Sequence, residues 1–155
     1  EAGRPLFVRT PHSHMNLGNF MLAQLYGAFA PLKIGMDVLI QDEGVKTDVM
    51  VAQGGLFKTP VIAQQVLADS LGIPITVMDT ASEGGPWGMA VLAVYAKDGG
   101  SESLPDFLDS KVFKNPQSTT LTPNAAGVEG CKKFIANYQA GLALEQQAGG
   151  LVADK

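Results

Sequence analysis

Hydrophobic and polar positions change their period along the chain, and the sharpest change falls within residues 49–69. Val49 to Ala52 is a short apolar, β-branched run, typical of a strand that is covered on both faces. Gly54 and Gly55 follow, and such a pair frees the backbone and removes side-chain bulk. Apolar residues then recur at helical spacing from Val61 to Ala68. The pattern predicts a strand, a glycine turn and an amphipathic helix.

This helix has a start signal and is followed by a second predicted strand. Thr59 is expected to cap the helix, with Pro60 at its first position. Ile75 to Met78 then has the composition of a short strand, so the whole is a βαβ unit with parallel, right-handed connectivity. Unpaired backbone N–H groups at such a helix start often face a nucleotide-binding crevice. Many similar turns bind nothing, so a purely structural turn stays open.

A second polar, glycine-rich turn runs from Asp79 to Gly85, and Pro86 is expected to start a helix of small residues. Glu83 in this turn is a candidate general base or metal ligand. We favour a carboxylate that caps the helix, where the helix dipole attracts negative charge. Trp87 is interpreted as a packing anchor rather than a ring that stacks on a ligand.

The rest of the chain is predicted to be mostly helical. A long helix, or two helices bent at Pro31, covers residues 17–40, with Asn16 as its N-cap. Its expected core stripe is Leu17, Met21, Leu25 and Ala28. The other expectations, in chain order, are a possible strand at residues 6–8, a charged connector at 41–48, a short helix from Leu104, a loop at 115–124, a final amphipathic helix at 128–147 and a frayed tail at 149–155.

Composition indicates one globular domain, because 46% of the residues are hydrophobic and only 17% are charged. The net charge of −4 argues against a nucleic-acid partner, which needs clustered Lys and Arg. No apolar run reaches the roughly twenty residues that span a bilayer, so no membrane partner is expected. Cys131 is the single cysteine, which fits a cytoplasmic protein. Its neighbours Lys132 and Lys133 would suit a reactive thiol, but a buried or merely tolerated thiol is favoured. The chain starts at Glu1 without methionine, so a piece of a longer protein with an incomplete active site is expected.

No metal site is predicted. His12 and His14 project to the same side of an extended segment, a spacing that suits a metal ligand pair. No Cys, Asp or Glu stands nearby to complete the set, so surface histidines are favoured. The sequence has neither a Gly-x-x-x-x-Gly-Lys-Ser/Thr phosphate loop nor a Gly-x-Gly-x-x-Gly helix start, which disfavours a dinucleotide-binding domain.

The two glycine turns resemble a known family. Residues 54–60, followed by 65–69 and 71–75, resemble the adenosine-binding segment of FGGY carbohydrate kinases. Residues 83–93 resemble the Gly/Ala-rich helix of the same family, and residues 134–145 are similar to the terminal helix of its xylulokinase-like branch. The segment from Lys58 to Asp69 is one residue longer than in many members, which leaves the roles of Gln64 and Gln65 open.

The resemblance implies a fold and an activity. The fold is α/β, an actin-like ATPase (ribonuclease H-like) C-terminal lobe, partial, with a βαβ core and flanking helices over residues 1–155. The activity is transfer of the ATP γ-phosphoryl group, with Mg²⁺, to a hydroxyl of a ketopentose. D-xylulose is the first choice of sugar and L-ribulose the second.

The resemblance also implies which functional residues belong to this chain and which to the other lobe of the kinase. Gly54 and Gly55 would let adenosine approach the backbone, and Lys58 and Thr59 would line the adenine or ribose. The catalytic Asp and most of the ketopentose pocket would lie in the other lobe, so no catalytic residue is expected here. The alternative is a non-catalytic nucleotide-sensing or interaction domain on the same fold, in which the Gly/Ala helix and the apolar face of residues 17–40 would serve in a homodimer.

Overall fold

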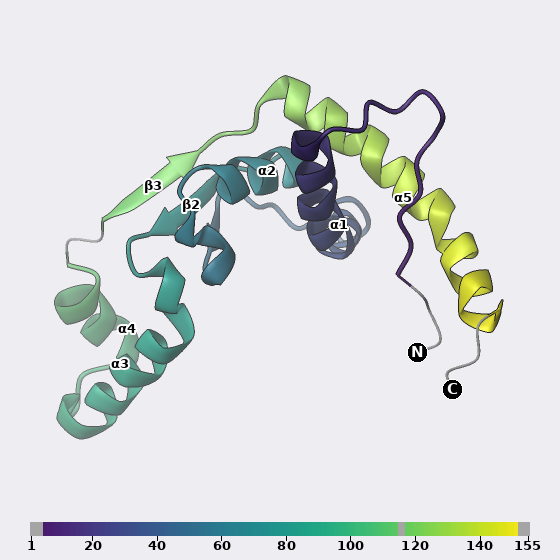
Figure 1. Ribbon diagram of the computed structural model, residues 1–155. Helices are drawn as coiled ribbons and strands as arrows, with labels where there is room; N and C mark the ends of the chain where they lie inside the picture. Colours follow the sequence, from purple (N-terminus) through teal and green to yellow (C-terminus); the bar gives the residue numbers. More distant parts are fainter. Residues whose placement is uncertain (1–4, 115–116, 152–155) are drawn as a thin grey trace. The chain divides into compact units, whose positions relative to one another are not determined.

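The computed structural model describes residues 5–114 and 117–151. The chain divides into two compact units, and Figure 1 labels most of their helices and strands. The sheet unit comprises residues 46–68 and 72–123, and the helical unit comprises residues 1–45, 69–71 and 124–155.

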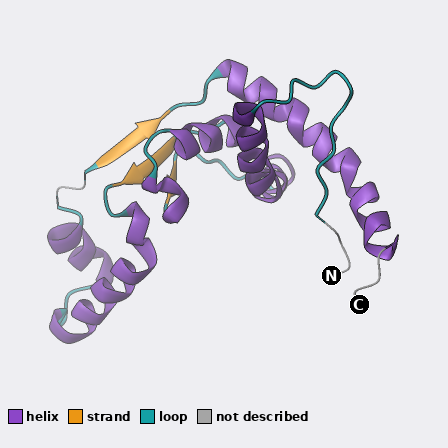
Figure 2. Ribbon diagram, in the orientation of Figure 1, coloured by secondary structure: helices purple, strands orange, loops and turns teal. Residues whose placement is uncertain are grey.

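The sheet unit is built on three strands in the order β1-β2-β3, drawn in orange in Figure 2. β1 (Met50–Ala52) and β2 (Ile75–Met78) run parallel, with Met50 opposite Ile75. α2 (Ile62–Leu71) connects them along the chain. The predicted βαβ unit and its parallel strands are therefore confirmed, and Ile75, which is completely buried, lies in its core.

β3 (Ser118–Leu121) pairs antiparallel with β2, so the prediction of a loop over residues 115–124 was wrong for this segment. The flanking prolines suggested a loop, but threonine and leucine suit a partly exposed edge strand. The hydroxyl oxygens of Thr76 and Thr120 lie 2.8 Å apart across the strand pair. Asn115 and Pro116 lie outside the described residues.

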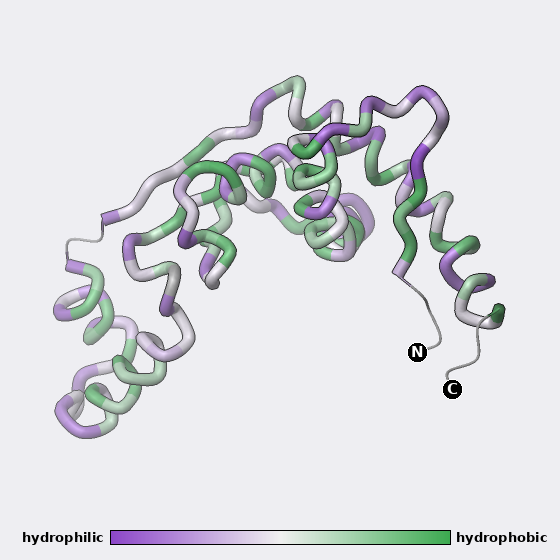
Figure 3. The backbone as a smooth tube through the Cα atoms, in the orientation of Figure 1, coloured by the Kyte–Doolittle hydropathy of each residue, from purple (hydrophilic) through white to green (hydrophobic). Residues whose placement is uncertain are grey.

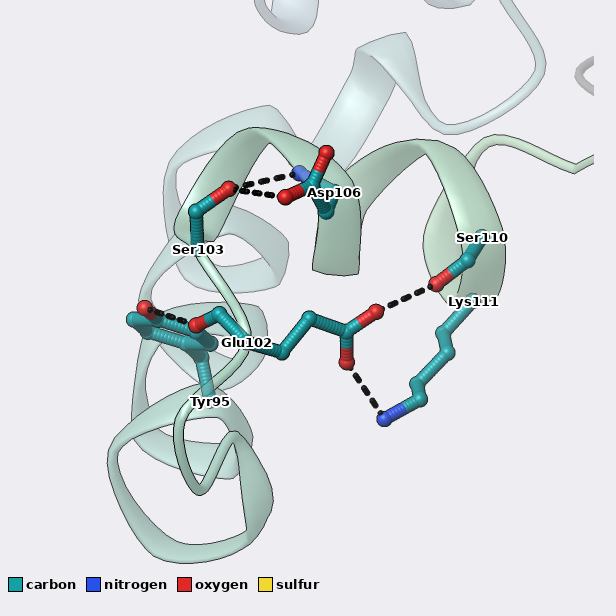
Figure 4. A network of polar contacts seen from close by, with 6 residues as sticks. All are labelled: Tyr95, Glu102, Ser103, Asp106, Ser110 and Lys111. Atoms are coloured by element: carbon teal, nitrogen blue, oxygen red, sulfur yellow. Dashed lines mark hydrogen bonds and ion pairs between the residues drawn. The ribbon is translucent and has the colours of Figure 1, made fainter.

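A helical hairpin follows β2 and leads back toward β3 in the chain. α3 (Gly84–Asp98) is joined to α4 (Leu104–Phe107), which continues as a π-helical turn, Leu108–Val112. The Tyr95 and Phe107 rings pack 5.2 Å apart, and the Tyr95 hydroxyl donates to the Glu102 carbonyl at 2.8 Å (Figure 4). Trp87 packs on Phe113 at 5.6 Å, so the interpretation of Trp87 as a packing anchor is confirmed.

Glu102 ties this hairpin together through its side chain. Its carboxylate accepts from Lys111 Nζ at 2.8 Å and from Ser110 Oγ at 3.0 Å (Figure 4). These hydrogen bonds lower the pKa of Glu102, the one to Lys111 most strongly. The loop that precedes α4 is thus held by charged contacts at the surface.

The helical unit contains two long helices, α1 (Leu17–Asp37) and α5 (Ala125–Leu151). Asn16 caps α1 as predicted, because its side chain accepts from the Asn19 N–H at 2.8 Å. α1 contains Pro31 and continues into a π-helical turn, Val38–Asp42. The core of the unit brings together buried residues of both helices, with aromatic residues around them: Ala30, Cys131 and Ile135, with Tyr26, Ile34, Phe134 and Tyr138.

Four predictions for this unit need correction. Leu17 and Met21 are 76% and 54% exposed, so the expected core stripe of α1 is wrong; Phe29 and Ala30 are its buried residues. Residues 6–8 form no strand. The last helix begins at Ala125, because the Asn124 side chain accepts from the Ala126 N–H at 2.9 Å and caps it. Of the expected frayed tail, residues 149–151 are helical, and 152–155 lie outside the described residues.

Hydrophobic residues lie along much of α3 (Figure 3), and several are at the surface, including Met89, Leu92 and Val94. Even so, no helix within residues 5–114 and 117–151 combines the length and the apolar character needed to cross a membrane. Cys131, by contrast, is 2% exposed, so of the two favoured interpretations the buried thiol is the one observed.

Candidate functional site

The first glycine turn follows β1 directly. Gly54 has φ 126° and ψ 168°, a conformation that essentially only glycine adopts. Its N–H donates to the Ala81 carbonyl at 2.7 Å, and its carbonyl accepts from the Phe57 N–H at 3.0 Å. A side chain at Gly55 would find no described heavy atom within 4 Å of its Cβ. The turn is therefore fixed at Gly54 and open at Gly55.

A short 3₁₀ helix, Gly55–Lys58, separates this turn from α2, and α2 starts later than predicted. Thr59 does not cap it, and Pro60 is not its first residue. Instead, Val61 adopts φ 71° and ψ −52°, and the Ile62 N–H donates to the Pro60 carbonyl at 2.8 Å. This is a γ-turn of the rare, strained kind.

A cavity of about 340 Å³ lies beside this γ-turn, within the sheet unit. That volume is at the low end of the range of small-molecule pockets, roughly 300–1,000 Å³. Its walls come from the 3₁₀ helix and γ-turn, the start of α2, the carboxyl end of β2 and the edge of β3. The lining residues are Phe57, Lys58, Thr59, Pro60, Val61, Gln64, Val77, Met78, Asp79, Ala81 and Thr119.

Two of the four predicted nucleotide-binding residues, Lys58 and Thr59, thus line this cavity. The other two, Gly54 and Gly55, are not among its lining residues, although they directly precede the helix that forms one wall. The cavity offers one cation, one carboxylate, two hydroxyls and an amide around an apolar floor. This combination suits recognition of a flat, polar-edged ring better than covalent chemistry.

Lys58 joins the two glycine turns. Its Nζ lies 2.9 Å from Glu83 Oε1, and both side chains are more than half exposed. Glu83 precedes α3, but its side chain makes no capping hydrogen bond within the described part of the chain, so the prediction of a capping carboxylate was wrong. The carboxylate binds a cation from the other turn instead. An exposed pair of this kind adds little stability.

The second glycine turn differs from the first in its backbone. Gly84 has φ −53° and ψ −39°, an ordinary helical conformation, and α3 already begins at this residue, so the prediction that Pro86 starts the helix was wrong. A Cβ at Gly84 would collide with the side chain of Gln53, the residue after β1. Glycine suits this position because the Gln53 side chain lies close to it, whereas its backbone conformation is one that other residues also adopt.

The cavity contains residues that sequence analysis missed. Asp79, at the carboxyl end of β2, was assigned only to a turn, and Gln64 was left without a role. Gln64 is 4% exposed, although it is polar. The available signal for Asp79 was its position, because the carboxyl ends of two parallel strands meet at one edge of a sheet. Gln64 had no such signal, since its partners are backbone atoms distant in the sequence.

The histidines and the cysteine considered in the sequence analysis are not among the residues that line this cavity. His12 and His14 are exposed in the segment before α1. Within the described residues, no group of three or more His, Cys, Asp or Glu side chains is placed to hold a metal ion. Cys131 is packed in the core of the helical unit.

A comparison with protein families adds to this geometry. Residues 1–97 match the model for the C-terminal domain of the FGGY family of carbohydrate kinases. The match includes both glycine turns, β1, β2 and most of α3. That domain has the actin-like ATPase fold, and the three-stranded sheet with its flanking helices is a partial form of it. Among curated proteins, none matches the chain.

Proposed function

The chain belongs to the FGGY family of carbohydrate kinases, and we propose that it holds ATP for phosphoryl transfer to a ketopentose, specifically D-xylulose. Carbohydrate kinases are phosphotransferases, and the family implies the use of ATP. The observation that carries the proposal is the position of the cavity. It lies at the carboxyl end of β2, within the matched residues except for Thr119, and Lys58 and Thr59 line it.

In this proposal the adenosine occupies the cavity beside the γ-turn, and Gly54 and Gly55 keep the approach to it free of side chains. Apolar groups of the lining would contact the ring, and the polar groups around them would contact its edges. Phosphoryl transfer depends on positioning and on charge stabilisation rather than on covalent steps by the protein. Positioning is what this cavity offers.

Residues 1–155 form, in this proposal, the nucleotide-holding part of a larger kinase. The sugar pocket and the aspartate that accepts the proton of the sugar hydroxyl would belong to an N-terminal lobe. The cavity is lined by the hydroxyls of Thr59 and Thr119 and the carboxylate of Asp79, and we assign none of them a catalytic role. The full kinase, and not this part of it, would carry the activity.

Mg²⁺ in this proposal enters as its complex with the ATP phosphates. It typically keeps several waters and binds phosphate oxygens plus one or two carboxylates. The described residues do not fit a metal site held by protein alone, because they contain no group of three or more ligating side chains. Asp79 is the one carboxylate among the described lining residues, and we assign it no metal contact.

The proposal also specifies which ketopentose is the substrate. D-xylulose is favoured because residues 134–145, in α5, resemble the terminal helix of the xylulokinase-like branch. This segment lies beyond the residues that match the family model.

Release of ADP by the intact protein tests the proposal. We expect ADP formation from MgATP to depend on a ketopentose, with the highest kcat/KM for D-xylulose. D-ribulose and a reaction without sugar are the controls. A higher kcat/KM for L-ribulose would mean that L-ribulose is the substrate, and the assignment as a carbohydrate kinase would be unchanged. ATP binding without sugar-dependent ADP release would instead favour a nucleotide-sensing domain.

A further inference from the structure

Gln64 is a buried polar residue in the first turn of α2, and both hydrogens of its amide nitrogen are engaged. Nε2 donates to the Ile75 carbonyl at 2.9 Å and to the Thr119 carbonyl at 2.7 Å. An amide nitrogen has two hydrogens, so these contacts use both. They also decide which end of the amide is nitrogen, because two carbonyls demand donors. The side chain is therefore held in one orientation.

The carbonyl oxygen of the same amide, unlike its nitrogen, is not engaged by the part of the protein that the structure describes. Among the described residues, Gln64 Oε1 has no hydrogen-bond partner. The one fully buried side-chain atom without a partner in that part of the chain is Thr80 Oγ1, so Gln64 Oε1 is not sealed off. Gln64 is 4% exposed, and it lines the cavity beside the γ-turn. Because Gln64 is one of the lining residues of this cavity, we infer that its free acceptor is reached from there.

An acceptor held in one orientation distinguishes ligands by the donors that they present to it. Adenine carries an N–H₂ donor at its 6-position, whereas guanine carries an oxygen acceptor there. A pinned amide cannot turn its nitrogen toward guanine without breaking two hydrogen bonds inside the protein. Leaving a buried polar group unpaired is costly, and this is how enzymes reject near-identical substrates.

We propose that Gln64 is the residue that selects adenine over guanine nucleotides, by accepting a hydrogen bond at its carbonyl oxygen from the 6-amino group. This inference rests on the proposed function, in that the cavity holds the base of the nucleotide. It adds a specificity-determining role for a side chain whose amide nitrogen simultaneously joins α2 to β2 and β3.

The first experiment changes the nucleotide and leaves the protein intact. The intact kinase is assayed for kcat/KM with MgATP, with purine riboside 5′-triphosphate, which lacks the 6-substituent, and with MgGTP. We expect ATP to exceed the 6-unsubstituted nucleotide by about two- to tenfold, and GTP to be at least about tenfold worse than ATP. Equal kcat/KM for ATP and GTP would overturn the inference, but it would not contradict the assignment as a kinase.

The second experiment tests the residue with a matched control. Gln64→Met removes the acceptor and keeps the length of the side chain, and we expect the ATP-to-GTP ratio of kcat/KM to fall toward one. The ratio does not depend on how much of the variant is folded, so lower stability does not obscure it. Gln65→Met is the control, because Gln65 donates to the Thr122 carbonyl at 2.9 Å and is not a lining residue. It should keep the wild-type ratio.

Two further outcomes are informative. A ratio that survives in Gln64→Met would overturn the inference. If no nucleotide is turned over, the proposed function fails, and binding of adenosine and guanosine to the same protein by equilibrium dialysis then decides the inference. Preference for adenosine that is lost in Gln64→Met would support it, and binding of neither or of both equally would overturn it.

Discussion

The two glycine turns each follow a strand in the sequence, but they have different physical roles. Gly54 is in a backbone conformation that other residues avoid, and the space next to Gly55 is open. Gly84 is in ordinary helical geometry and is crowded by Gln53. The turn at Gly54 and Gly55 precedes the segment that lines the cavity, whereas Gly84 packs against Gln53. A pair of glycines after a strand can thus mean access for a ligand or close packing.

The largest effect is expected from a bulky residue in the open turn. Gly55→Trp should raise KM for ATP in the intact protein by at least about thirtyfold, equivalent to about 2 kcal/mol of binding free energy. The indole would occupy the approach to the cavity, while the unfolding temperature stays close to wild type. Steady-state kinetics and thermal unfolding measure the two quantities.

The matched control is the same substitution in the second turn. A Cβ at Gly85 would likewise meet no described heavy atom within 4 Å, but Gly85 belongs to α3. Gly85→Trp should leave KM for ATP within about twofold of wild type, a change near 0.4 kcal/mol. Equal effects of both tryptophans would remove the distinction between the turns.

The next effect concerns backbone strain. Gly54→Ala should lower the free energy of unfolding by about 1–3 kcal/mol, because alanine is disfavoured at φ 126°. Denaturant unfolding measures this loss. A variant as stable as wild type would mean that the turn relaxes at no cost, and that its conformation is not what requires glycine.

A smaller loss is expected in the crowded turn. Gly84→Ala should cost about 1 kcal/mol of unfolding free energy, because the Gln53 side chain must move away. Gly88→Ala, in the same helix but with no described heavy atom within 4 Å, should instead gain roughly 0.5–1 kcal/mol. Opposite signs in urea unfolding would establish crowding as the reason for Gly84, and a loss for both would contradict it.

The ion pair between the turns should matter least. Glu83→Gln should change the unfolding free energy by less than about 1 kcal/mol, because both partners are more than half exposed. The change should shrink further as salt is added. A loss of several kcal/mol at physiological salt would show that the pair holds the two turns together.

Sequence reasoning worked where short-range physics decides the structure. β1, β2 and their parallel pairing followed from apolar runs separated by a helix, and the Asn16 cap followed from local chemistry. It failed where the structure of a segment depends on a partner that is distant in the sequence. β3 exists because β2 offers it an edge, and no local signal outweighed the flanking prolines.

The candidate site shows the same limit. Lys58 and Thr59 were found because they follow a recognisable turn, and both line the cavity. The start of α2 was misplaced, because Thr59 and Pro60 form a good local start signal that the γ-turn at Val61 overrides. Gln64 was not assigned, since its importance depends on carbonyls of two strands that only the fold brings to it.

The most direct test of the nucleotide-binding role is a crystal structure of the intact protein with ADP. We expect the purine to lie in the cavity beside the γ-turn, in contact with Lys58 or Thr59, with its 6-amino group toward Gln64. A purine bound elsewhere, with this cavity empty, would contradict the central claim that the first glycine turn leads to the nucleotide.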